Sequence, residues 1–377
     1  MLAMTASSVK AEVGEQPVSG TSRAWPGEVA GLDVRSLYNR PMTILLAWLQ
    51  FAVCVGAIGL AGPVLTRNGE KIARLTGMSH SWAGLIMLAS ATSLPELFTG
   101  LSAVSLADAP NIAMGDALGS CMFNLVMLAV LDALSREEPM WRRIDQGHIL
   151  TAGFGVILIG FVGALVLVAR DGLDFHIGHV SLYSPFLILL YLVSMRAAFF
   201  YERRPRITAG EPAGPTSGDS LGQAVIAYGL SALVVGVVGA WLPFAGLAVA
   251  DAMNWQTTFV GTLFVAAATS LPELVVTITA LRLGATDMAI GNLLGSNLFV
   301  ILVIALDDLV YTKGPLFAAV SPAHAVTAFA GSIMAAICIV ALLYRPGNRF
   351  FGLIGWISLS LLAVYLLGSY TIYLHDH

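Results

Sequence analysis

A seven-residue stretch, Ala-Thr-Ser-Leu-Pro-Glu-Leu, occurs twice in this chain, at residues 91–97 and again at residues 268–274. The second copy begins 177 positions after the first, and each copy lies inside a long apolar segment. An identical repeat of this length indicates an internal duplication. We therefore interpret the chain as two related halves and expect the repeated stretch to serve the same purpose in both.

Composition places the duplicated chain in a membrane. Of its 377 residues, 57% are hydrophobic and only 11% are charged, which is far from the composition of a soluble domain. The three cysteines, Cys54, Cys121 and Cys338, lie in apolar segments and suggest neither a disulfide framework nor a zinc site. We predict an all-α polytopic membrane protein that lies in the lipid bilayer, needs no cofactor and has no nucleic-acid partner.

Each copy of the repeat carries one glutamate, Glu96 or Glu273, in the middle of a segment that is otherwise almost free of charge. An ionisable side chain at the centre of a membrane helix costs roughly 2.5 to 3.5 kcal/mol or more, and such residues usually mark functional sites. A single glutamate could serve only as a structural hydrogen-bonding group. Two glutamates at equivalent repeat positions favour a shared functional site.

A proline stands directly before each glutamate. Because Pro95 and Pro272 cannot donate a backbone hydrogen bond, the carbonyls of Ala91 and Ala268 lose their helical donors. Interrupted backbone at membrane depth is tolerated where it faces protein or a water-filled cavity. Carboxylates, hydroxyls and free carbonyls together form the oxygen surroundings that Ca²⁺ or Na⁺ prefers. The pattern predicts a cation site, and the hydroxyl residues beside its glutamates are Thr92, Ser93, Thr269 and Ser270.

Ten apolar segments are long enough to span a bilayer, five on each side of a polar stretch. Residues 1–41 are polar and lack the pattern of a signal peptide, so we expect a disordered N-terminal tail. Residues 202–220 are rich in Pro, Gly, Ser and Arg, as linkers are. The predicted halves are therefore 42–201 and 221–377. The expected spans are 42–65, 82–107, 111–134, 149–169, 181–201, 222–243, 255–283, 286–311, 323–344 and 350–373.

Five is an odd number, so the second half enters the membrane in the opposite orientation to the first. This gives the two inverted five-helix repeats that are typical of secondary transporters. Thirteen Lys and Arg residues fall in loops on the side of the linker, whereas only Arg170 and Lys313 fall in the opposite loops. Basic residues gather on the cytoplasmic side. We therefore expect a multi-pass protein of the bacterial inner membrane with its N-terminus outside, although four basic residues of the tail oppose this orientation.

A second pair of related stretches follows the glutamates. Residues 115–124 read Gly-Asp-Ala-Leu-Gly-Ser-Cys-Met-Phe-Asn, and residues 291–300 read Gly-Asn-Leu-Leu-Gly-Ser-Asn-Leu-Phe-Val. Asp116, Ser120 and Asn124 recur every four residues, which places them on one helix face. The small Gly and Ser positions allow close helix contact. The counterparts of the three polar residues are Asn292, Ser296 and Val300.

The paired Thr-Ser-Leu-Pro-Glu-Leu and Gly-(Asn/Asp)-x-x-Gly-Ser motifs resemble the two alpha-repeats of the calcium/cation antiporter superfamily, the sodium/calcium exchanger family in particular. The resemblance is close over residues 81–134 and 255–311. In that family the repeats form a diamond of cation sites between four helices. The ligands that the resemblance implies here are Glu96, Glu273, Thr92, Ser93, Thr269, Ser270, Ser120, Ser296, Asn124 and carbonyls near Ala89 and Ala266.

This chain departs from the family pattern at two positions. Val300 stands where many members carry Asp or Asn, so one oxygen ligand is missing, and Asp116 stands opposite Asn292 of the second motif. Asp116 either lines the permeation path or is a solvated or paired acid near an aqueous end. Asn124 could instead hold two helices together. Asp132, Asp307 and Asp308 lie at expected helix ends and are predicted to be interfacial.

Two carboxylates can neutralise one Ca²⁺ or, alternately, two Na⁺ or two H⁺. We therefore expect an antiporter that exchanges Ca²⁺ for Na⁺ by alternating access, with Ca²⁺ and the counter-ion as its partners. An H⁺-coupled exchanger of Ca²⁺ or another divalent cation is the alternative, because Val300 reduces the number of oxygen ligands. A cation channel is a hypothesis from another class. An enzyme has no support, because no Ser/His or metal-histidine constellation falls at membrane depth.

Overall fold

The computed structural model of the chain describes residues 34–76, 89–135, 140–170, 172, 175–202, 220–282, 284, 286–347, 349–350 and 354–375. The linker expected at 202–220 lies almost wholly outside these residues, as does most of the expected tail. The part of the tail that is described is helical, because the first helix begins at Val34 rather than at residue 42. The predicted tail therefore extends too far into the chain.

Helices dominate both halves of the described chain. Two short antiparallel hairpins, β1 (His176–Ile177) with β2 (Val180–Ser181) and β3 (Arg349–Phe350) with β4 (Ile354–Gly355), precede the last helix of each half. In the first half the helices are α1 (Val34–Leu75), α3 (Ala89–Thr92), α4 (Leu94–Ser105), α5 (Pro110–Leu134), α6 (Met140–Arg143), α7 (His148–Arg170) and α8 (Tyr183–Glu202). In the second half they are α9 (Leu221–Met253), α10 (Thr257–Val260), the π-helical turn η2 (Gly261–Val265), α11 (Ala266–Thr269), α12 (Leu271–Arg282), α13 (Thr286–Val310), α14 (Leu316–Ala319), α15 (Ala323–Tyr344) and α16 (Trp356–His375).

The chain is a multi-pass integral membrane protein. Among the described residues, seven helices are long and apolar enough to cross a membrane, and a bent pair, Thr257–Thr269 with Leu271–Arg282, makes an eighth span. The expected span at 181–201 corresponds to α8, whose apolar part is shorter. The expected span at 82–107 begins outside the described residues. The all-α membrane fold is thus confirmed, while the described residues do not confirm the predicted number of about ten spans.

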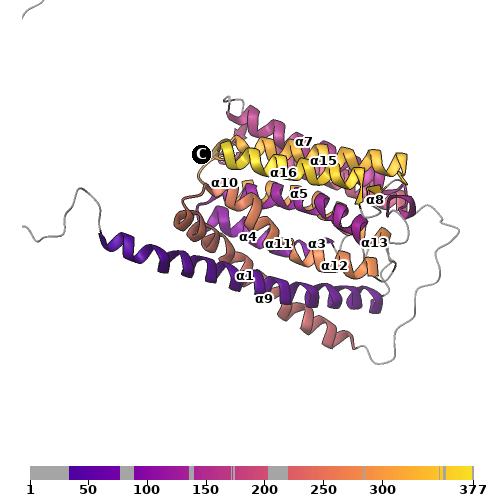
Figure 1. The fold of residues 1–377 in the computed structure, drawn as a ribbon, viewed down its shortest axis with the longest axis horizontal. Helices are drawn as coiled ribbons and strands as arrows, with labels where there is room; N and C mark the ends of the chain where they lie inside the picture. Colours follow the sequence, from indigo (N-terminus) through magenta and orange to yellow (C-terminus); the bar gives the residue numbers. More distant parts are fainter. Residues whose placement is uncertain are drawn as a thin grey trace, which may run out of the picture. The chain divides into compact units, whose positions relative to one another are not determined.

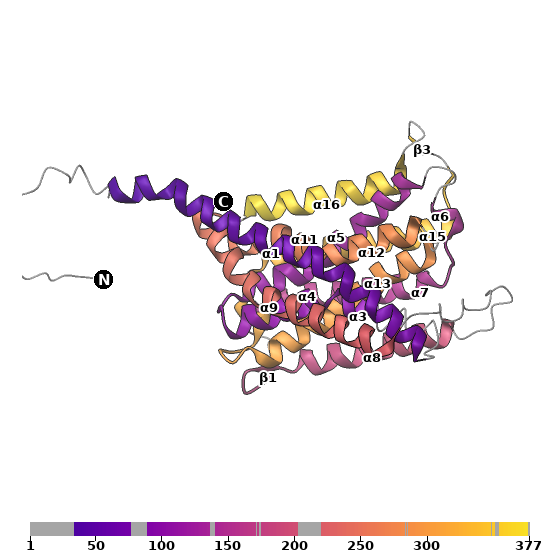
Figure 2. The ribbon, with the colours of Figure 1, turned by 90° about the horizontal axis from the view of Figure 1, so that it is seen from below.

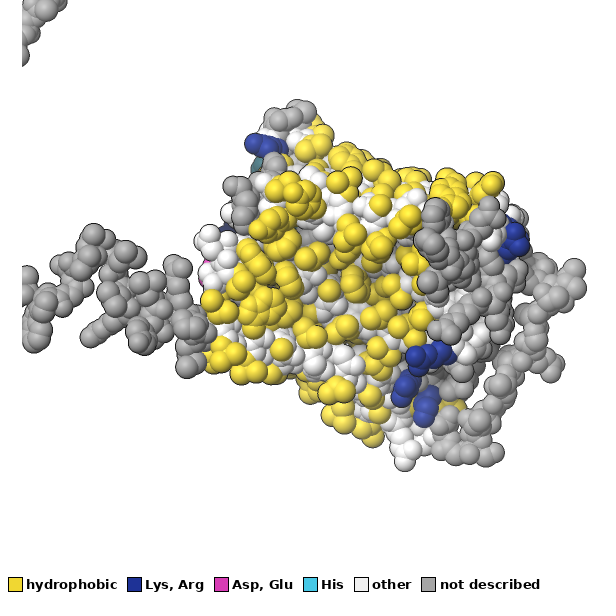
Figure 3. Space-filling model, viewed as in Figure 1, with side chains coloured by type: hydrophobic (Ala, Val, Ile, Leu, Met, Phe, Trp, Pro, Cys, Tyr) yellow, Lys and Arg dark blue, Asp and Glu magenta, His cyan; other side chains and the backbone are white. Residues whose placement is uncertain are grey.

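Within residues 43–377 the helices form layers around two buried helices, α5 and α13. In Figure 1, α7, α15 and α16 lie on one side of α5, and α1 and α9 lie on the other. Polar side chains on α5 and α13 face other helices, because 72% and 83% of their apolar windows are buried. The surface is apolar where it meets lipid: Figure 3 shows hydrophobic side chains over most of the face, with Lys and Arg at its ends.

Connections gather at the two ends of the bundle (Figure 2). The α4–α5 and α13–α14 connections share one end, where Lys313 Nζ lies 2.6 Å from Asp108 Oδ2. We name this end the Lys313 face. The end of α8, the start of α9 and the α12–α13 connection share the opposite end, which we name the linker face.

The helices that carry the glutamates are interrupted at equivalent points. Ser93 separates α3 from α4, and Ser270 separates α11 from α12. In the second half the bend at this point is 45°. The proline that follows each break lies in the first turn of the new helix, where its missing N–H is tolerated. Each glutamate consequently lies in the first turn of a helix, the end that favours negative charge.

Two buried aspartates fasten the last helix of each half to a central helix of the other half. Asp308, near the end of α13, accepts hydrogen bonds from Ser181 N (2.9 Å), Ser184 Oγ (2.5 Å) and Leu316 N (2.8 Å). These contacts fix the start of α8. The prediction that Asp308 is interfacial is wrong, because its side chain is 0% exposed.

Asp132, at the equivalent place near the end of α5, makes the matching contacts. It accepts from Met140 N (3.4 Å), Gly355 N (3.1 Å) and Ser358 Oγ (2.7 Å), and so fixes the start of α16. Asp132 is 1% exposed, so its predicted interfacial position is also wrong. The two sets of contacts match one for one, as an internal repeat requires.

Candidate cation site

The two glutamates are buried and are held by hydroxyls from the opposite half. Glu96 is 1% exposed and Glu273 is 0% exposed. Ser270 Oγ donates to Glu96 Oε1 at 3.2 Å, and Ser93 Oγ donates to Glu273 Oε1 at 2.9 Å. The serine at each helix break therefore crosses to the carboxylate of the other repeat. Without both halves, neither carboxylate has this partner.

The serines of the second motif lie beside the same carboxylate oxygens. Ser120 Oγ is 3.5 Å from Glu96 Oε1, and Ser296 Oγ is 3.4 Å from Glu273 Oε1. These separations are long for hydrogen bonds between oxygens. The serines are therefore close enough to share a ligand with the glutamates without being fully engaged by them.

One oxygen of each glutamate has no hydrogen-bond partner among the described residues. These atoms are Glu96 Oε2 and Glu273 Oε2. The two glutamates also interact electrostatically with each other. Leaving a buried carboxylate oxygen unsatisfied is costly, and a bound cation removes that cost. The residues present therefore fit a hard cation with oxygen ligands.

The threonines of the repeat link the glutamates to the second motif. Thr269 Oγ1 lies 2.7 Å from Asp116 Oδ1, and Thr92 Oγ1 lies 3.4 Å from Asn292 Oδ1. Thr269 also lies 3.4 Å from Ser120, and Thr92 lies 3.4 Å from Ser296. These six residues are all buried.

Asp116 belongs to this buried network. Its side chain is 1% exposed, and it interacts electrostatically with Glu96. A solvated position does not fit this burial, while a place on the permeation path and a role as a paired acid both stay predictions. Its counterpart Asn292 has the same threonine contact but no charge, so the two halves differ in charge here.

Asn124 both joins two helices and leaves an oxygen free. Its Nδ2 donates to Asn297 Oδ1 at 3.0 Å, while Asn124 Oδ1 has no partner among the described residues. Asn297 in turn donates to the carbonyl of Cys121 at 3.2 Å. Sequence reasoning missed Asn297, which orients Asn124. Its place in the second motif, opposite Cys121, is the signal that could have identified it.

The sequence predicts carbonyl ligands near two alanines, Ala266 and Ala89. The carbonyl of Ala266 accepts Ser270 N at 3.1 Å and lies 3.1 Å from Thr269 Oγ1. This oxygen is therefore engaged by the helix. Ala89 is the first residue of α3.

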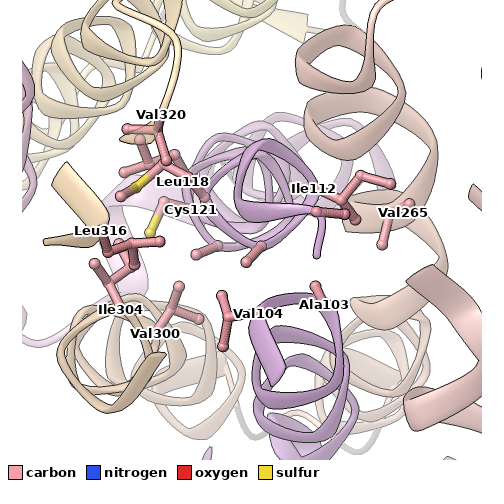
Figure 4. Packing of buried hydrophobic residues seen from close by; sticks show 14 of the residues in the cluster. Ala103, Val104, Ile112, Leu118, Cys121, Val265, Val300, Ile304, Leu316 and Val320 are labelled. Atoms are coloured by element: carbon pink, nitrogen blue, oxygen red, sulfur yellow. The ribbon is translucent and has the colours of Figure 1, made fainter. Parts of the chain in front are cut away.

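Val300 leaves the second half of the site without the oxygen that Asn124 gives the first. Its side chain is 0% exposed and belongs to an apolar cluster with Val104 and Ile304. Figure 4 shows Val300 and Ile304 on one helix with Val104 beside them on another. At this position the second half therefore has apolar packing where the first half has the amide of Asn124.

Comparison with known proteins agrees with this arrangement. The family described as sodium/calcium exchanger protein matches residues 46–200 and 223–371, once in each half. The sodium/calcium exchanger MaX1 of Methanosarcina acetivorans is 28% identical over 310 residues, which are 74% of this chain and 85% of that protein. The inner membrane protein YrbG of Escherichia coli is 27% identical over 234 residues, 62% of this chain and 70% of that protein.

Two solved structures have the same fold. Native YfkE aligns with a TM-score of 0.60 at 17% identity and covers 90% of this chain and 98% of its own. The sodium-calcium exchanger NCX_Mj, soaked with Na⁺ and Sr²⁺, aligns with a TM-score of 0.57 at 22% identity and covers 86% and 98%. Because the family match spans both halves of the chain, this protein is a member of the sodium/calcium exchanger family, a family of transporters rather than enzymes.

Proposed function

We propose that this protein is an antiporter that exchanges Ca²⁺ for Na⁺ across the membrane by alternating access, with Glu96 and Glu273 as its main cation ligands. One observation carries the proposal: each glutamate has one oxygen held by a serine of the other repeat and one buried oxygen that no described residue hydrogen-bonds. Such a pair neutralises one Ca²⁺ or two Na⁺. The remaining proposed ligands are Thr92, Ser93, Thr269, Ser270, Ser120, Ser296, Asn124 and Asp116.

The two unpaired oxygens also give a reason for obligatory exchange. When the site is empty, two buried carboxylates repel each other and lack partners, which opposes a change of access. Either Ca²⁺ or the counter-ions remove both costs. A site that changes access only when occupied exchanges ions and does not leak them.

A proton-coupled exchanger is the second candidate, and Val300 is the observation that favours it. Na⁺ needs several oxygen ligands, and this position offers an apolar side chain. In that case each glutamate carries a proton in place of Na⁺. Under this alternative, Val300→Asn should increase the dependence of Ca²⁺ transport on Na⁺.

Flux measurements separate these functions. Purified protein in proteoliposomes is loaded with Na⁺ at matched pH or with acid at zero Na⁺, and uptake of radiolabelled Ca²⁺ is measured. Uptake driven by outward Na⁺ supports sodium coupling, and uptake driven only by the pH gradient supports proton coupling. Uptake down the Ca²⁺ gradient alone, at rates far above those of transporters, would instead indicate a channel. No uptake under either gradient would contradict Ca²⁺ exchange.

A further inference from the structure

A third buried acid, Asp307, lies outside the set of proposed ligands. It is on α13, three residues before the end of the helix at the Lys313 face, and its side chain is 1% exposed. The sequence predicted an interfacial position for it, which the burial contradicts. Neither of its carboxylate oxygens has a hydrogen-bond partner among the described residues. In this it differs from its neighbour Asp308, which accepts three hydrogen bonds.

The carboxylate of Asp307 lies against the backbone of Gly100, one helical turn after Glu96. A Cβ atom on Gly100 would lie 2.5 Å from Asp307 Oδ2 and 2.8 Å from Asp307 Oδ1. Gly100 follows Glu96 by four residues on α4, so the two positions share one face of that helix, about 6 Å apart along its axis. Only glycine at position 100 leaves room for the acid.

Asp307 is also connected electrostatically to the proposed cation site. Asp116, four residues before Ser120 on α5, lies within the range of like-charge repulsion from both Glu96 and Asp307. The three acids therefore extend from the glutamate pair toward the Lys313 face. Since α4 ends and α5 begins at that face, this is the direction in which a cation would leave or enter the site.

The other half of the molecule has no such extension. By the internal repeat, the counterparts of Asp307, Asp116 and Gly100 are Leu131, Asn292 and Thr277. All three counterparts are uncharged, and all three are buried. On the linker side of the glutamates the repeat thus lacks the two carboxylates that it has on the side of the Lys313 face.

We propose that Asp307 is a cation-binding residue on the path between the Lys313 face and the glutamate pair, where it holds the entering Ca²⁺ or counter-ion one step before Glu96. The proposal rests on the proposed exchange function. Buried carboxylates are normally paired or bind a cation, and neither oxygen of Asp307 has a hydrogen-bond partner in the part of the chain that the structure describes. The asymmetry makes the affinity for cations different at the two faces.

The test measures the KM for Ca²⁺ separately at each face. Thr312 is exposed at the Lys313 face, and all three native cysteines are buried, so a Thr312→Cys background can be labelled with a membrane-impermeant biotin maleimide. Capture on streptavidin then separates vesicles that expose the Lys313 face from those that expose the linker face. Radiolabelled Ca²⁺ uptake gives the KM for each population.

In Asp307→Asn one charge near the path of the cation is lost. The KM for Ca²⁺ should therefore rise about tenfold at the Lys313 face and stay unchanged at the linker face. Gly100→Ala, which keeps the charge but displaces the carboxylate, should act in the same direction at the same face. Asp307→Leu, which introduces the residue of the other repeat, should resemble Asp307→Asn. Thr277→Val is the matched control in the linker half and should leave the KM at the Lys313 face unchanged.

An unchanged KM at both faces in Asp307→Asn, or an equal change at both, would overturn the proposal while exchange by the wild type still supported the proposed function. Absence of exchange in the wild type would instead contradict the proposed function. Equilibrium binding of radiolabelled Ca²⁺ to the purified proteins in detergent, which needs no exchange, then decides the question for Asp307: weaker binding in Asp307→Asn is expected, and equal binding overturns the proposal. Thermal unfolding checks that each variant is folded.

Discussion

The centre of the cation site and the positions around it follow the internal repeat to different degrees. At the centre, each glutamate accepts a serine from the other half, at 2.9 and 3.2 Å, and keeps one oxygen unpaired. Around it, the equivalent positions of the two repeats differ: Asp116 corresponds to Asn292, Asn124 to Val300, and Asp307 to Leu131. Under the proposed function, the symmetric centre is the one site that both sides reach. The asymmetric surroundings are then what distinguishes those sides.

The largest expected effect comes from removing either carboxylate of the symmetric centre. Glu96→Gln and Glu273→Gln should each reduce Ca²⁺ exchange by about a hundredfold or more, because one charge is lost where two are needed for Ca²⁺. Counter-ion-driven flux in proteoliposomes measures the loss. Strong flux in both variants would remove the glutamates from the mechanism, and strong flux in only one would break the symmetry of the centre.

The two anchoring aspartates offer a second symmetric pair, tested by stability. Asp308→Ala and Asp132→Ala should each destabilise the protein by about 3 kcal/mol, because each leaves buried donors without an acceptor. Thermal unfolding in detergent should show similar decreases in Tm. Lys313→Ala, which removes an exposed ion pair, serves as the control and should change Tm little. A much larger decrease in Tm for one variant than for the other would show that the two aspartates do not stabilise the two halves equally.

Among the asymmetric positions, Asp116 should have the largest effect. Asp116→Asn makes this position match Asn292 and removes one charge beside Thr269 and Glu96. We expect the apparent affinity for Ca²⁺ to fall about tenfold and the number of counter-ions per Ca²⁺ to decrease. Asn292→Asp in the same background tests whether the charge works equally well in the other half. Unchanged transport and affinity in Asp116→Asn would exclude this acid from the mechanism.

The serines that cross between the halves should have the smallest effect. Ser93→Ala and Ser270→Ala each remove a hydrogen bond to a carboxylate, a loss of about 1 kcal/mol, or about fivefold in affinity for Ca²⁺. The loss in Ser270→Ala should be at least as large as that in Ser93→Ala, because Ser270 Oγ also bonds Ser120 Oγ at 3.0 Å. Thr279→Ala, whose exposed hydroxyl bonds only its own helix, is the control and should not change affinity.

Much of the fold could be predicted from residue patterns. The membrane class follows from 57% hydrophobic residues, and the duplication follows from the identical stretches at 91–97 and 268–274. Helix boundaries were less predictable, since α1 extends from Val34 to Leu75 rather than from 42 to 65. Apolar length shows where a segment can enter lipid, but a helix continues beyond the bilayer wherever its backbone bonds remain favourable.

The residues of the candidate site could be singled out from the sequence, but their contacts could not. Glu96 and Glu273 stand out because charge is rare in these segments, whereas Asn297 does not, because an amide in a membrane helix can serve packing alone. The burial of Asp132, Asp307 and Asp308 could not be foreseen from their places at helix ends. Whether such an end meets water or protein depends on which other segment covers it.

By itself, the sequence determined that the chain is a duplicated membrane protein and that two glutamates, two helix-breaking prolines and their hydroxyl neighbours occur at equivalent positions. These conclusions depend on local properties: hydropathy, charge and the missing N–H of proline. Only the tertiary structure decided that Ser93 meets Glu273, that Ser270 meets Glu96, and that Asp307 lies over Gly100 with no hydrogen-bond partner among the described residues. These contacts join residues far apart in the chain, and their geometry is fixed by how whole helices pack against one another.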